Sequence, residues 1–183
     1  ISLKANGEFG KTLATDGLFS GPVKFVNMGQ NLVFASFVWT GVPQELPTNI
    51  DNGIDIRSDS YLVDGKNMVP IKTGDRLKTG AIIVTRITLH ADEGVPDALL
   101  VNLMPAGLEL ENQNLAHSMK LDSLLLNGRT IRHQADILHQ EFQDDRYVAA
   151  LDLSPYRESV LYFIARAVNP GQYVVPPAQI ESM

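Results

Sequence analysis

Short apolar runs alternate with turn residues along most of the chain, and nine runs have the length and residue types of β-strands. In the clearest run, residues 82–89, odd-numbered residues face one side and even-numbered residues the other, with many β-branched side chains. The other predicted strands are residues 9–13, 23–26, 32–39, 54–57, 99–103, 147–153, 160–168 and 172–175. This pattern predicts an all-β fold, an antiparallel β-sandwich of two stacked sheets.

Turn residues divide these runs and suggest a domain boundary. Asp16-Gly17, Asp64-Gly65 and Asn127-Gly128 are dipeptides that favour tight turns, and Asp64-Gly65 predicts a hairpin. Residues 43–53 are rich in proline, asparagine, aspartate and glycine, which do not favour strands. We therefore expect three parts: a β-domain segment at 1–42, a linker at 43–53 and a β-sandwich domain at 54–183.

One region departs from the strand pattern, between residues 112 and 144. Its apolar residues Ile131, Ala135, Leu138 and Phe142 are spaced four, three and four apart, which is typical of one face of a helix. A second, shorter helical turn is predicted near residues 115–119. The sandwich should thus carry one or two short helices inserted at about 113–144.

Composition excludes several classes of partner and chemistry. The net charge is -6, and no sequence cluster of Lys or Arg offers the basic stripe that nucleic acid or an anionic membrane would bind. The chain has no cysteine, so this segment holds no disulfide, thiolate nucleophile or usual structural zinc site. The longest apolar run, 32–39, is much shorter than the ~20 residues of a membrane-spanning helix.

The titratable residues do not form a catalytic pattern. His133 and His139 are six residues apart, which on a helix places them on opposite sides, so we expect neither metal nor cofactor. Asp144 and Asp145 precede Arg146, and the favoured interpretation is a structural ion pair at the start of the strand 147–153. With no nucleophile elbow or phosphate-binding loop, no catalytic residue is predicted and the chain is not expected to be an enzyme.

Five blocks together resemble a known family: residues 57–66, 80–89, 96–111, 144–146 and 166–183. Their order resembles the last macroglobulin-type domain of bacterial α2-macroglobulins, which implies a macroglobulin- or fibronectin-III-like sandwich at 54–183. Residues 1–42 resemble the second part of the CUB-like domain that flanks the thioester domain in this family. The chain is accordingly expected to be a segment of a longer protein.

This resemblance implies a protease inhibitor of the periplasm, a lipoprotein anchored to the inner membrane of a Gram-negative bacterium and suited to host-defence evasion. Its implied partners are target proteases bound by the full-length parent, the thioester domain of the same chain and a peptidoglycan-synthesising penicillin-binding protein. Membrane contact would come only through a lipid anchor outside this segment.

The resemblance also assigns roles near the end of the chain. It implies that Met183 covers the thioester site of the parent, with a tyrosine as the next family residue. From the residues themselves, Pro170 and Gly171 end one strand, and Pro176 and Pro177 stop a final strand at 172–175, because proline cannot donate to a sheet ladder.

Two alternatives remain open. The β pattern and the scattered tyrosines also fit an adhesin-like or carbohydrate-binding envelope module, unless Tyr61, Tyr147 and Tyr162 are core residues. The second alternative is a metallohydrolase that would use His133, His139 and the acidic pair.

Overall fold

The computed structural model describes residues 26–30, 32, 34 and 52–183 of the chain. By its internal contacts the chain divides into two units, Ile1–Pro47 and Thr48–Met183, and the fold described here is that of the second unit. The predicted strands at 9–13, 23–26 and 32–39, the turn at Asp16-Gly17 and most of the linker lie wholly or largely outside the described residues. The predictions for residues 1–42 therefore stay predictions.

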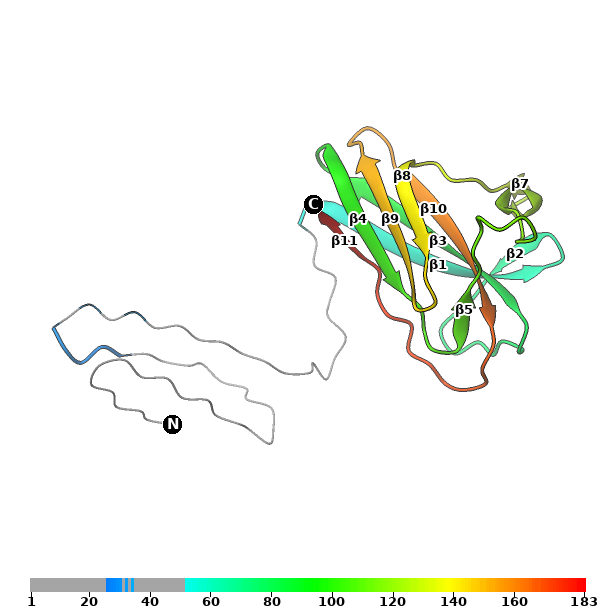
Figure 1. Ribbon diagram of the computed structural model, residues 1–183, viewed down its shortest axis with the longest axis horizontal. Helices are drawn as coiled ribbons and strands as arrows, with labels where there is room; N and C mark the ends of the chain where they lie inside the picture. The colour runs from blue at the N-terminus through cyan, green and yellow to red at the C-terminus, as the bar shows by residue number, and fades with distance from the viewer. Residues whose placement is uncertain (1–25, 31, 33, 35–51) are drawn as a thin grey trace. The chain divides into compact units, whose positions relative to one another are not determined.

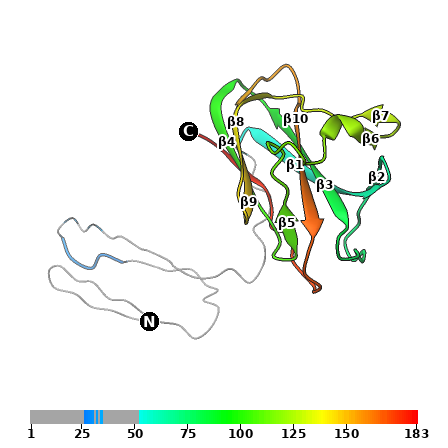
Figure 2. The ribbon, with the colours of Figure 1, turned by 45° about the vertical axis from the view of Figure 1, so that its right-hand side comes forward.

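Two β-sheets make up the described unit, so the predicted all-β sandwich is confirmed. One sheet has the strand order β5-β10-β3-β1-β2-β6-β7 and the other β11-β4-β9-β8. Figures 1 and 2 show β4, β8 and β9 lying on one side of β10, β3 and β1. The strands are β1 (Ile54–Asp64), β2 (Asn67–Pro70), β3 (Ile82–Ala91), β4 (Val95–Leu103), β5 (Leu108–Leu110), β6 (Leu125–Leu126), β7 (Arg129–Thr130), β8 (Asp136–Phe142), β9 (Arg146–Leu153), β10 (Ser159–Ala167) and β11 (Gln179–Ser182).

An inner core fills the space between the sheets. Ile87 and Leu89 of β3 pack there with Leu100 of β4, and all three are fully buried. At its centre the rings of Tyr147 (β9) and Phe163 (β10) stack with centroids 4.8 Å apart. The period of two predicted for 82–89 is thus confirmed on this face, because the odd-numbered side chains of β3 point between the sheets.

An outer core covers the opposite face of the seven-stranded sheet. Val84 of β3 and Tyr162 and Ile164 of β10 are buried there beneath Leu124 and Ile131, which belong to the segment 111–134. Because both faces of β10 are covered, its residues are buried almost without interruption, a pattern that hides strand periodicity.

Two of the predicted tight turns are confirmed. Asp64-Gly65 joins β1 to β2, and Gly65 has a φ of +61°, a region in which a residue without a Cβ is unstrained. Asn127 and Gly128 both have positive φ and join β6 to β7 as a two-residue hairpin loop.

The predicted helices are wrong. The only helix in the described part of the chain is a 3₁₀ turn at Leu121–Ser123, and the end of the predicted helix is the strand β8. The register of β8 on β9 shifts between Ile137 and His139, and this irregularity interrupts the period of two. Leu138, a member of the expected helical stripe, is 56 % exposed as a result.

The predicted final strand at 172–175 is also wrong. No strand lies between the end of β10 and Gln179, where β11 begins and pairs with β4. Pro176 and Pro177 therefore come before the last strand and do not end it, since a residue without an N–H delays the start of the ladder.

Candidate functional site

The closing segment, residues 168–183, contains Met183, the residue to which the family resemblance gives a role. The first half of this segment is fixed to the sandwich by Tyr173. A Cβ on Gly107 would lie 2.3 Å from the Tyr173 ring, and one on Gly171 would lie 2.7 Å from it. The ring therefore occupies space that only glycine leaves free at both positions. The Tyr173 hydroxyl donates a hydrogen bond to the Pro170 carbonyl (3.2 Å), and the Val168 N–H donates to the Gly107 carbonyl (3.0 Å).

The second half of the closing segment is held by the sheet. Strand β11 pairs antiparallel with β4, and Ile180 packs against the inner core. Met183 directly follows the end of β11, and its N–H donates to the Asp97 carbonyl (3.2 Å). Asp97 has a φ of +52°, and its own N–H donates to the Asp152 carboxylate (3.0 Å). The Met183 backbone is thus anchored, while the residue is 68 % exposed.

The acidic pair lies in the turn between β8 and β9. Arg146 donates two hydrogen bonds to the Asp145 carboxylate, at 2.9 and 2.6 Å, and this contact lowers the pKa of Asp145. The Asp145 carbonyl accepts from the Met104 N–H at 2.8 Å, which ties the turn to the end of β4. The Asp145–Arg146 ion pair therefore sits at the first residue of β9 on the exposed surface, where such pairs contribute little to stability.

The histidines do not converge. His139 is exposed beside Glu141 (3.1 Å), whereas His133 is partly buried and its Nδ1 accepts a hydrogen bond from the Tyr162 N–H (3.3 Å). Burial lowers the pKa of His133, which favours the neutral ring. Within the described residues, no group of three or more potential metal ligands is found.

The tyrosines are mostly core residues. Tyr61, Tyr147 and Tyr162 are each less than a tenth exposed, and burial raises the pKa of Tyr147. A core location is the result that counts against a carbohydrate-binding face. Tyr156 and Tyr173 are exposed, but the Tyr173 ring packs against Gly107 and Gly171, and Tyr156 does not by itself form such a face.

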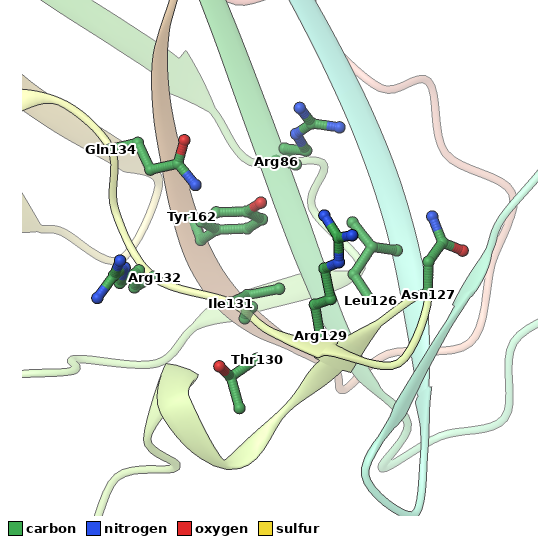
Figure 3. Close-up of a pocket in the computed structure, with 9 residues that line it drawn as sticks. All are labelled: Arg86, Leu126, Asn127, Arg129, Thr130, Ile131, Arg132, Gln134 and Tyr162. Carbon is green, nitrogen blue, oxygen red and sulfur yellow. The ribbon is translucent and has the colours of Figure 1, made fainter.

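A pocket on the outer face gathers arginines that are far apart in the sequence. Its volume is about 460 Å³, and it is lined by Arg86 of β3, Arg129 of β7, Arg132 and the ring of Tyr162. Figure 3 shows the guanidinium of Arg129 directed toward Arg86, and Arg132 on the other side of Ile131. This pocket was not predicted from the sequence, although the alternation in 82–89 placed Arg86 on the face opposite to Ile87 and Leu89.

The fold and its closing segment define the class of this module. Residues 53–183 match the family model described as the bacterial alpha-2-macroglobulin MG10 domain. The described unit is thus an MG10-type β-sandwich domain. Among the described residues, no helix is long and apolar enough to cross a membrane.

Comparison with curated proteins and solved structures gives the same family. The chain is 39 % identical over 164 residues to the alpha-2-macroglobulin of Xylella fastidiosa strain Temecula1, covering 88 % of this chain and 10 % of that protein. An alignment of that length is longer than the segment 53–183, so the similarity extends into the part before residue 53. The chain belongs to the bacterial α2-macroglobulin family.

Two solved structures extend the likeness to three dimensions. Escherichia coli alpha-2-macroglobulin activated by porcine elastase matches with a TM-score of 0.66 and 39 % identity, over 78 % of this chain and 12 % of that one. Salmonella alpha-2-macroglobulin reacted with methylamine matches with a TM-score of 0.63 and 37 % identity, over 78 % and 9 %. These relatives come from Gram-negative bacteria. The chain spans about a tenth of the length of the curated relative it matches.

Proposed function

We propose that this chain is the C-terminal structural module of a protease-trapping α2-macroglobulin of the cell envelope, and that it has no catalytic activity of its own. The observation that carries the proposal is the match of residues 53–183 to the MG10 domain. The relative from Escherichia coli is described as activated by porcine elastase, and we extend a response to proteases to the parent of this chain.

The proposal includes a role for Met183 as a cover over the thioester of the parent. Its support is geometric: the ladder of β11 on β4 and the hydrogen bond to Asp97 position the Met183 backbone, and its thioether side chain is exposed. A flexible, polarisable side chain can adapt to the surface that it shields from water. The Salmonella relative is described as reacted with methylamine, an amine that we propose as a probe of this cover.

Protease trapping is tested on the full-length parent. After incubation with trypsin, we expect cleavage of a small chromogenic substrate to persist while digestion of a large protein substrate is blocked. A trapped enzyme keeps its active site but is closed off from bulky substrates. Unhindered digestion of the large substrate by trypsin would refute the trapping function.

The cover is tested by replacing Met183 in the same parent. Met183→Gly should speed the reaction of methylamine with the thioester, measured as release of the free thiol, because the apolar shield is lost. The matched control is Leu138→Ala, which removes an exposed apolar side chain from β8 at the far edge of the same sheet. Equal rates in wild type, Met183→Gly and the control would remove the covering role and leave the trapping proposal standing.

The same proposal specifies location and partners. The parent would be an inner-membrane lipoprotein of the periplasm, and its partners would be target proteases, its own thioester domain and a penicillin-binding protein that synthesises peptidoglycan. We expect the parent to sediment with inner membranes and to become soluble when its lipidated cysteine, outside this segment, is replaced. Recovery in the cytoplasm would exclude this location.

A further inference from the structure

The pocket on the outer face holds three arginines that form no ion pair with any carboxylate in the described part of the chain. Five ion pairs involve described residues, and none of them includes Arg86, Arg129 or Arg132. The chain as a whole carries a net charge of -6, so an unpaired basic pocket is not the result of a general excess of cations. The fold concentrates these charges locally.

Arg86 is the most constrained of the three. Its Nε is buried and has no hydrogen-bond partner, and its place in the ladder is fixed by Tyr162 of β10 on one side and Asp59 of β1 on the other. Asp59 is the facing carboxylate, but the Nε of Arg57 contacts its Oδ2 at 3.1 Å. A buried guanidinium donor without a protein acceptor is unfavourable, so an acceptor entering the pocket would be stabilised at this Nε.

The remaining lining comes from separate segments and combines the apolar Leu126 and Ile131 with several polar side chains. Figure 3 shows the Tyr162 hydroxyl directed toward Arg86, with the Gln134 amide beside it and Asn127 at the opposite edge. These groups supply hydrogen-bond donors in addition to the guanidiniums. The tight turn at Asn127-Gly128 positions Arg129, since β7 begins directly after it. The pocket thus has a fixed floor on β3 and β10 and one wall on the β6–β7 hairpin.

We propose that this pocket binds a phosphate-class anion, with Arg86 and Arg129 as its main ligands and Arg132 at the rim. A phosphate group carries about -1.5 to -2 charges near neutral pH and three acceptor oxygens, which match two or three guanidiniums better than a single carboxylate does. The size of the cavity suits a phosphate borne on a larger molecule. Two sources share this chemistry, a soluble phosphate ester and a phospholipid headgroup.

The proposal is tested first with pyrophosphate as the soluble probe and the 183-residue chain as the protein. Titration followed calorimetrically, at an ionic strength held constant with chloride, should give saturable binding with a dissociation constant of about 1 mM or lower. Arg129→Gln and Arg86→Gln should each weaken this binding at least about tenfold, because each removes a charge-assisted donor. Absence of saturation by about 10 mM would overturn the proposal.

Matched control variants distinguish anion binding in this pocket from non-specific attraction by surface arginines. Arg157→Gln removes an arginine that already pairs with Asp136, so it should leave the affinity unchanged. Asp59→Asn should tighten binding, because it removes the carboxylate that faces Arg86. Equal weakening by Arg157→Gln and Arg129→Gln would also overturn the proposal. Arg129 is exposed in a two-residue strand, so its variant tests binding even if Arg86→Gln does not fold.

A second arm identifies the source of the phosphate. Sedimentation with phosphatidylcholine vesicles, with and without phosphatidic acid, measures headgroup binding, again with Arg129→Gln as the variant. Binding that needs phosphatidic acid and Arg129 assigns the site to a headgroup. Binding of pyrophosphate alone assigns it to soluble esters.

Discussion

The two cores on either face of the seven-stranded sheet are built differently. The inner core lies between the long strands of the two sheets, and its central side chains, including the stacked Tyr147 and Phe163, have no exposure. The outer core is covered by a segment with two strands of two residues each, and it leaves buried polar atoms of Arg86 and Thr88 without partners. One face therefore provides stability, and the other retains a polar cavity that can bind a ligand.

The largest loss of stability should come from truncating a side chain at the centre of the inner core. Phe163→Ala removes a fully buried ring stacked on Tyr147 and should lower the free energy of unfolding by about 3–5 kcal/mol. Urea denaturation measures it, with Leu138→Ala as the exposed control, expected to change stability by less than about 0.5 kcal/mol. A loss below about 1 kcal/mol for Phe163→Ala would show that the inner core is not the stabilising one.

The outer core should be more tolerant of the same kind of truncation. Leu124→Ala removes a buried side chain from the cover and should cost about 2 kcal/mol, at the low end for leucine because short strands can relax into the space. Hydrogen exchange should speed up in β6 and β7 and stay slow in β9. Equal acceleration in β9 would mean that the two cores unfold as one unit.

Removing the unpaired charge should stabilise the outer face. Arg86→Met keeps the apolar stem and deletes a buried donor without a partner, so unfolding should require about 1 kcal/mol more in the absence of anions. Thermal unfolding in chloride buffer checks the sign. A decrease in melting temperature would show that Arg86 already has a stabilising partner.

The outer core should also be the acid-sensitive one. Burial lowers the pKa of His133 from its ordinary value of 6.5, and its Nδ1 accepts a hydrogen bond that protonation of that atom would abolish. Between the lowered pKa and pH 6.5 the unfolded chain therefore binds more protons than the folded chain. The stability that the neutral His133 contributes is complete above pH 6.5 and is lost as the pH falls through 6.5 toward the lowered pKa. Urea midpoints near neutral pH and near pH 5 should differ less in His133→Gln than in wild type.

The sequence predicts those parts of the fold that local chemistry determines. The alternation in 82–89 identified β3 and both of its faces, and Asp64-Gly65 and Asn127-Gly128 were correctly assigned as turns. Strand β8 was missed because its register shift imitates helical spacing. Strands β6 and β7 have two residues each, too few to show any period.

The two candidate sites, Met183 and the arginine pocket, also differ in how far the sequence indicated them. Met183 came from a family resemblance, and its covering role stays a prediction. The arginine pocket has no local signal, because Arg86 and Arg129 are brought together by sheet register and by a hairpin folding over it. Only the three-dimensional structure could reveal that these two residues line one pocket.

The pairing of β11 with β4 has an evolutionary consequence. Sheet pairing uses main-chain groups, and of the four residues of β11 only Ile180 packs against the core. Substitutions at Gln179, Glu181 and Ser182 should therefore leave the position of Met183 unchanged. Drift at these three sites can alter the charge beside Met183 while leaving its place in the molecule unchanged.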